Sequence, residues 1–75
     1  MQDRIKAVMA QIFNVEVSSI SEASSPQEIE RWDSLRHMQL ILAIEDEFGV
    51  TFSDEDIPNL LTLRAIEDTV GQLAT

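Results

Sequence analysis

The sequence predicts an all-α protein, a small four-helix bundle with three main helices and one short helix. Apolar residues recur at helical spacing near the start, in the middle and at the end of the chain. Glycine and proline number only two each, which disfavours a turn-rich β-sandwich. At 75 residues the chain has room for one domain, expected over residues 1–75, whose core leaves little space for a deep pocket.

The first predicted helix covers residues 2–13. Its apolar residues follow the spacing of one helix face, which buries that face and leaves the opposite one in water. We expect this stripe to lie in the core: Ile5, Val8, Met9, Ile12 and Phe13.

The connection from 14 to 33 loses the helical period and contains five serines and Pro26. Within it, residues 25–29 have the composition of a short helical turn, with the proline near the first helical position. Long irregular connections in small domains are often functional. Three apolar residues are expected to pack this connection against the body: Val15, Val17 and Ile20.

The strongest predicted helix covers residues 34–48. Asp33 is a good N-cap because its carboxylate can accept from the free N–H groups of the first turn. Gly49 is expected to end the helix, since glycine adopts the left-handed conformation at little cost. An acidic run lies near the C-terminus, where negative charge opposes the helix dipole: Glu45, Asp46 and Glu47.

The apolar residues of helix 34–48 form two groups. Leu40, Ile44 and Phe48 are spaced four apart and are expected to face the core. At 100° per residue, a second apolar group lies about 160° around the helix from the first, and Ile41 lies between the two groups. Either the helix is enclosed between other helices, or this second group is exposed for a partner or cargo: Leu35, Met38 and Leu42.

The last third of the chain predicts a short helix and a longer one. Ser53 or Asp54 is expected to cap a short helix through Ile57, with Pro58 limiting it. Thr62 is expected to cap the last helix, and its inward stripe has helical spacing: Leu63, Ile66, Val70 and Leu73.

Charge and composition exclude several classes of function. Fourteen acidic against five basic residues give a formal net charge of −9, which disfavours binding to nucleic acid or to an anionic membrane. The acidity either steers encounters with basic surfaces of other proteins or only keeps the chain in solution. No stretch is long enough to insert into a membrane and no signal peptide is present, so we expect a cytoplasmic location.

No catalytic or metal site is expected. The chain has no cysteine and a single histidine, and the acidic residues 54–56 lack the glycine and glutamate of a calcium loop. Ser34 and His37 lie three residues apart, but no oxyanion hole or glycine-rich elbow accompanies them. We therefore predict that the protein is not an enzyme, and that Ser34 is either a second cap residue or an accessible hydroxyl with another use.

Two motifs resemble those of the acyl carrier protein family. Trp32-Asp33-Ser34-Leu35 opens an apolar helix, and Glu45-Asp46-Glu47-Phe48 followed by Gly49-Val50 closes it. The match extends over nearly the whole chain, because the serine-rich connection and the flanking helices also have their counterparts. The resemblance implies that Ser34 carries covalent 4′-phosphopantetheine, whose terminal thiol holds acyl groups as thioesters.

The resemblance also implies partners and the residues that meet them. A phosphopantetheinyl transferase would load Ser34 from coenzyme A, with Asp33 and Leu35 beside the attachment point. Acyl-loading, acyl-transfer or condensing enzymes would then dock on a monomeric carrier. The implied docking residues are apolar and charged positions of helix 34–48: Leu35, Arg36, Met38, Leu42, Glu45, Asp46 and Glu47.

Some residues depart from the family's pattern. Arg36 and His37 stand where acidic residues are typical of carriers in fatty-acid synthesis, Gln39 where a glutamate is common, and Trp32 where a small residue is usual. These departures favour a specialised biosynthetic pathway over general fatty-acid synthesis. A peptidyl or aminoacyl carrier is the nearest alternative, and an unmodified helical interaction module is a further one.

Overall fold

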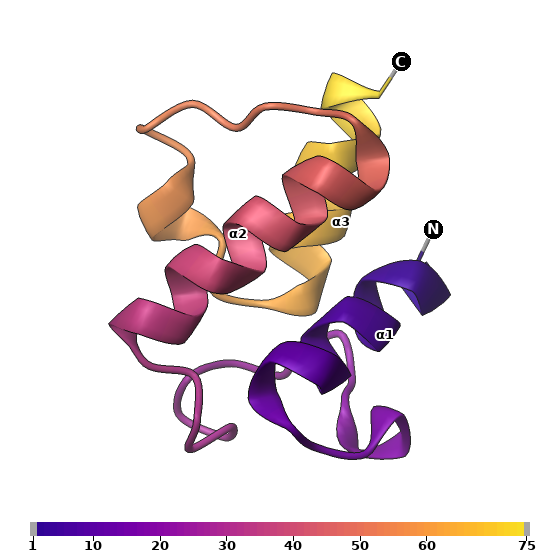
Figure 1. The fold of residues 1–75 in the computed structure, drawn as a ribbon, viewed down its shortest axis with the longest axis vertical. Coiled ribbons are helices and arrows are strands. Elements are labelled where there is room, and N and C mark those ends of the chain that lie inside the picture. The colour runs from indigo at the N-terminus through magenta and orange to yellow at the C-terminus, as the bar shows by residue number, and fades with distance from the viewer. Residues whose placement is uncertain (1, 75) are drawn as a thin grey trace.

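The computed structural model describes residues 2–74, and this part of the chain is all-helical. It contains α1 (Gln2–Phe13), α2 (Ser34–Phe48) and α3 (Leu63–Leu73), with two short 3₁₀ helices, η1 (Val17–Ser19) and η2 (Ile57–Asn59). Helix α2 runs diagonally through the middle of the molecule in Figure 1, with α3 behind it and α1 to its lower right. Helix α1 packs against both of the others.

The bounds of the helices follow from their caps. Asp33 has an extended backbone and its side chain accepts from the N–H of Arg36, while Gly49 ends α2 in the left-handed conformation at φ 65°. Thr62 caps α3 by accepting from the N–H of Ala65. The predictions of helices at 2–13 and 34–48 and of all three cap residues are therefore confirmed.

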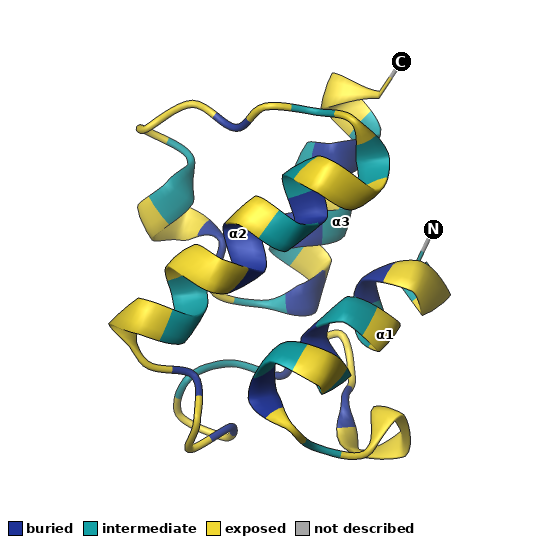
Figure 2. Cartoon of the chain, viewed as in Figure 1, coloured by how far each residue is buried: buried dark blue, intermediate teal, exposed yellow. Residues whose placement is uncertain are grey.

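The core lies where the three helices meet (Figure 2). Most predicted stripe residues are buried, and Ile41 joins them at 1% exposure. Val8 and Ile12 pack at the edge of the core, as does Phe48, which is only partly buried. The fully buried helical residues are Ile5, Met9, Phe13, Leu40, Ile44, Leu63, Ile66 and Val70.

The prediction for Leu73 was wrong, because 43% of this residue is exposed. It is the last residue of α3, and Figure 1 shows that this end of the helix projects above the level of α1. The apolar residues of α3 therefore keep their helical spacing beyond the part of the helix that other elements cover.

Only two of the three residues predicted to pack the connection 14–33 against the body do so. Ile20 is buried and Val15 partly buried, but Val17 lies in η1 and is 48% exposed, so its predicted packing was wrong. The expected turn at 25–29 is present, with the Ser25 carbonyl accepting from the N–H groups of Glu28 and Ile29. Ile29 and Trp32 add buried surface that the sequence analysis did not anticipate.

The short fourth helix was predicted in the wrong place and of the wrong type. Residues 54–56 form a turn, in which the Ser53 hydroxyl accepts from the N–H of Asp56 at 3.3 Å. A 3₁₀ helix follows from Ile57, and Pro58 lies inside its first positions. Proline suits the first positions of a helix because its missing N–H needs no partner there, so Pro58 lies near the start of this element and not at the end of one, where we expected it.

Candidate functional site

Ser34 is the first residue of α2, and it is exposed. Among residues 2–74, no hydrogen bond engages its side-chain oxygen. The first turn of α2 is capped by the neighbouring Asp33, so Ser34 is not the second cap that was one of its possible roles. The structure thus places a free hydroxyl at a helix N-terminus, where unpaired N–H groups favour a bound anion.

Asp33 is held by two hydrogen bonds from one residue. Its Oδ1 accepts from the backbone N–H of Arg36 at 2.8 Å, and its Oδ2 accepts from the guanidinium of Arg36 at 2.9 Å. The backbone N–H is the main cause that lowers the pKa of Asp33 below its ordinary value of 3.8, and the positive guanidinium acts in the same direction. Arg36, predicted to meet partners, is therefore already paired, although its side chain remains 39% exposed.

A chain of hydrogen bonds passes through His37. The indole Nε1 of Trp32 donates to Nδ1 of His37 at 3.0 Å, and Nε2 of His37 lies 2.9 Å from the carbonyl oxygen of Ile57. An indole N–H can only donate, so Nδ1 accepts, and the Nε2–H of His37 donates to the carbonyl oxygen of Ile57. With both ring nitrogens engaged, His37 has no lone pair for the hydroxyl of Ser34.

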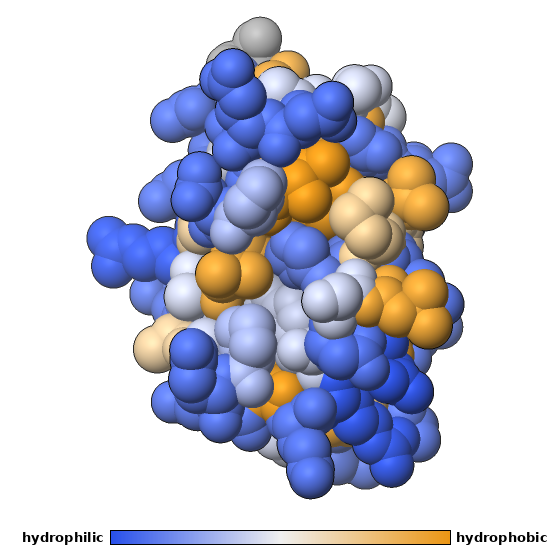
Figure 3. Space-filling model, turned by 90° about the vertical axis from the view of Figure 1, so that its left-hand side faces the viewer, coloured by the Kyte–Doolittle hydropathy of each residue, from blue (hydrophilic) through white to orange (hydrophobic). Residues whose placement is uncertain are grey.

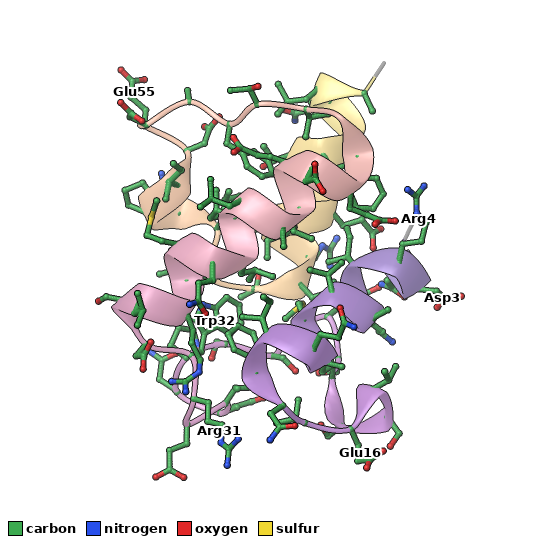
Figure 4. The ribbon with its side chains drawn as sticks, in the orientation of Figure 1. Asp3, Arg4, Glu16, Arg31, Trp32 and Glu55 are labelled. Carbon is green, nitrogen blue, oxygen red and sulfur yellow. The ribbon has the colours of Figure 1, made fainter. Side chains whose placement is uncertain are left out.

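Trp32 and His37 occupy the two positions of a hydrophobic staple, one before the N-cap and four after it. Their rings stack with centroids 6.1 Å apart, and Trp32 also packs on Phe13 at 4.9 Å. Figure 4 shows Trp32 directed inward between the start of α2 and α1, whereas Arg31 points away from the body. The sequence analysis missed this pair, which the staple spacing around Asp33 could have revealed.

A cleft of about 350 Å³ opens beside Ser34. Its walls come from three parts of the chain, the turn before α2, the start of α2, and the segment before α3. The lining residues are Pro26, Trp32, Asp33, Ser34, His37 and Leu61. A larger hollow of about 530 Å³ lies along α1 around Val8 and Val15, and Ser34 does not line it.

The second apolar group of α2 is exposed. Leu35 is 69% exposed, Met38 45% and Leu42 60%, so α2 is not enclosed on this side. The sequence left open whether this wide apolar arc is enclosed between helices or exposed. In the structure it is exposed. Figure 3 shows the side of the molecule where α2 begins, on which apolar patches interrupt an otherwise hydrophilic surface.

The acidic run of α2 is only partly free. Glu45 Oε2 accepts from the N–H of Phe52 at 2.8 Å, and Glu47 Oε2 forms an ion pair with Arg4 at 2.9 Å. Arg4 also donates to the backbone carbonyl of Glu47, placing positive charge at the C-terminus of α2. Asp46 is exposed and has no partner within the described part of the chain.

Two further features concern metals and membranes. Within residues 2–74, no three His, Cys, Asp or Glu side chains are grouped so that they could hold a metal ion. No helix in the same range is sufficiently long and apolar to span a bilayer.

Comparisons with known proteins agree on one family. A sequence profile described as a phosphopantetheine attachment site matches residues 3–70. An acyl carrier protein of Buchnera aphidicola subsp. Schizaphis graminum is 34% identical over 71 residues, which cover 95% of this chain and 90% of that protein. An acyl carrier protein of Thermosynechococcus vestitus is 32% identical over 69 residues, covering 92% and 85%.

The fold agrees as well. The solution NMR structure of a holo acyl carrier protein from Geobacter metallireducens superposes with a TM-score of 0.85 at 25% identity. The match covers 96% of this chain and 83% of that one. The chain therefore belongs to the acyl carrier protein family, whose sequence profile marks a phosphopantetheine attachment site.

Proposed function

We propose that this protein is an acyl carrier whose attachment residue is Ser34. The observation that carries the proposal is the free, exposed hydroxyl at the first position of α2, in the middle of the region that matches the family profile. A phosphodiester on this oxygen would lie against the unpaired N–H groups of the first turn, which favour negative charge. The residues at the start of α2 therefore fit the phosphate end of 4′-phosphopantetheine.

The division of roles is that of a carrier and not of a catalyst. The prosthetic group supplies the thiol that holds acyl groups as thioesters, and the chain itself has no cysteine. Asp33 keeps the start of α2 in place by capping it, so that Ser34 remains at the surface. Leu35, next along the helix, offers its exposed side chain to the enzyme that modifies Ser34.

The docking surface that we propose combines apolar and acidic residues of α2. Its apolar part is the exposed row Leu35, Met38 and Leu42, and Asp46 provides an unpaired negative charge near the far end. Arg36, Glu45 and Glu47 border it but also have partners within the chain. Partners with a basic, partly apolar face would be attracted by the net charge of −9. We expect them to be a phosphopantetheinyl transferase and acyl-loading, acyl-transfer or condensing enzymes.

The pathway that we favour is a specialised one. At the start of α2 this chain presents Arg36 and His37, and the preceding Trp32 is bonded to His37. An enzyme that binds this end of α2 would contact the paired guanidinium of Arg36 and the imidazole of His37. Carriers in fatty-acid synthesis are expected to have acidic residues at these positions. A peptidyl or aminoacyl carrier remains the alternative.

Intact mass tests the attachment. The protein is coexpressed with a promiscuous phosphopantetheinyl transferase, and we expect a mass increase of one phosphopantetheine that is absent in Ser34→Ala. Ser18→Ala is the matched control, because Ser18 is also exposed and lies in η1, away from α2. A wild-type protein that is folded but gains no mass would refute the carrier function and leave the unmodified interaction module.

A further inference from the structure

The cleft beside Ser34 has walls of two kinds. One part of the wall is apolar and is formed by Pro26, Trp32 and Leu61. Leu61 is 42% exposed. Asp33, Ser34 and His37 provide polar groups on the other part. Its volume of about 350 Å³ lies at the lower end of the range for small-ligand sites, about 300–1,000 Å³. The cleft is therefore suited to a small group that is partly apolar and partly polar.

Two of the residues that line the cleft, Trp32 and His37, are held in place by the fold. Trp32 is only 4% exposed and packs on Phe13, and its N–H is bonded to His37. His37 is bonded in turn to the carbonyl of Ile57, which ties the start of α2 to η2. A preformed site loses less conformational entropy on binding than one that must be ordered first.

Ser34 itself lines the cleft, so the first atoms of any group attached to it begin at this site. Attachment also lowers the intrinsic affinity that the cleft needs in order to be occupied. A ligand on a short flexible tether has an effective concentration in the millimolar range, so a site with a dissociation constant of about 1 mM would already be substantially occupied.

We propose that this cleft binds the pantoyl segment of the prosthetic arm on Ser34, with the geminal methyl groups against Trp32 and Leu61. This inference rests on the proposed function. The pantoyl unit follows directly after the phosphate, and it combines two methyl groups on one carbon with a hydroxyl and an amide. Its apolar side matches Trp32, Leu61 and Pro26, and its hydroxyl can donate to free lone pairs of the Asp33 carboxylate.

The inference assigns a function to Trp32 and Leu61 that the attachment of the arm does not require. The thiol and its acyl cargo are many bonds farther along the arm and remain outside the cleft, open to partner enzymes. Holding only the first segment of the arm restricts the directions in which the thioester projects from α2.

Isotope-filtered NMR tests the proposal. Unlabelled phosphopantetheine is attached to ¹³C,¹⁵N-labelled protein, and intact mass first establishes that loading is complete. We expect nuclear Overhauser effects from the two pantoyl methyl groups to the Trp32 indole and to the methyl groups of Leu61. The chain has one tryptophan and no tyrosine, so the single indole N–H resonance is unambiguous, and it should shift on loading.

Two variants make the test specific. Leu61→Ala removes an exposed wall of the cleft without touching the core, and should abolish the contacts between the pantoyl methyl groups and Trp32. Leu73→Ala removes a leucine of nearly the same exposure, 43%, that lies outside both the cleft and the proposed docking surface, and should leave them unchanged.

The remaining outcomes of the NMR experiment distinguish a failure of this inference from a failure of the proposed function. Complete loading with no contact from the pantoyl methyl groups to Trp32 would overturn the inference and leave the proposed function intact. Contacts to Trp32 that come from the thiol end of the arm instead of the pantoyl methyl groups would also overturn it. A protein that cannot be loaded would refute the proposed function first, and this inference with it.

Discussion

At the scale of single residues, the site depends on which of two neighbours caps the helix. Asp33 and Ser34 are both residues that cap helices well. Asp33 takes the cap because its backbone is extended, with φ −100° and ψ −178°, whereas Ser34 is already helical. The side chain of Ser34 is thereby released from a structural role, which is what a site of attachment requires.

The charge of Asp33 has a testable effect on stability. Its pKa is lowered in the folded protein, so its charged form stabilises the fold fully above its ordinary pKa of 3.8, and this contribution is lost as the pH falls through the lower folded-state pKa. Asp33→Asn keeps an oxygen for the cap but removes the charge. We expect urea unfolding to show the wild type as the more stable protein at pH 7, and the difference to disappear in strong acid. A difference independent of pH would show that the charge has no such role.

The hydrogen bonds of His37 permit a second prediction. His37→Ala leaves the N–H of the buried Trp32 without its acceptor, while the carbonyl of Ile57 still accepts from the N–H of Leu60. An unpaired group of this kind costs about 1–3 kcal/mol, so we expect the free energy of unfolding in urea to fall by that amount. Gln39→Ala is the control, because Gln39 is exposed on the same helix and should change stability by less than about 0.5 kcal/mol. Equal stabilities of the two variants would contradict a structural role for the bridge.

At the scale of elements, sequence reasoning succeeded where local chemistry decides the outcome. The start of α2 at Asp33, its end at Gly49 and the start of α3 at Thr62 depend on residues within one helical turn. The exposure of Leu73 and Val17 depends on where other elements end, and helical spacing carries no such information. For the same reason the sequence left open whether Leu35, Met38 and Leu42 were enclosed.

The candidate site was predictable to a similar extent. Ser34 was predicted as the attachment residue from its motif, and the structure confirms only that it is exposed at the start of α2. The cleft was not identified, because Leu61 is far in sequence from Pro26 and Trp32 and meets them only in the folded chain. The sequence analysis assigned no structural role to Trp32, although its spacing from His37 is that of a staple.

Helix α2 offers a direct test of the proposed docking surface. Asp46 is the acidic residue to change, because reversing Glu47 would also break its ion pair with Arg4. Asp46→Lys should slow association with a phosphopantetheinyl transferase at low salt, and the effect should shrink as salt screens the charges. Helicity measured by circular dichroism should persist, since a cation is favourable near the end of a helix.

Asp68→Lys is the matched control for this experiment. It changes the net charge equally, but Asp68 is exposed on α3. Stopped-flow association rates that fall equally in both variants would assign the effect to overall charge and not to the surface of α2.

At the scale of the whole molecule, the dominant feature is an excess of negative charge over a small surface. Fourteen acidic side chains lie on a chain of 75 residues whose radius of gyration is 11.1 Å. Charges this close together are within or near the screening length at physiological salt, about 8 Å. The acidity that attracts basic partners therefore also opposes compactness of the chain.

This conflict predicts that added salt stabilises the protein. Two ion pairs, Arg4–Glu47 and Asp33–Arg36, oppose the trend, but exposed pairs contribute only about 0–1 kcal/mol each. The repulsion should outweigh them, so the melting temperature should rise between low and moderate sodium chloride. Asp54→Lys, at an exposed position without a partner among the described residues, should raise the melting temperature at low salt and flatten its dependence on salt. A gain of 1 kcal/mol corresponds to about 4–8 °C in a domain of this size, which is readily measured. A melting temperature that falls as salt is added would show instead that the two ion pairs outweigh the repulsion.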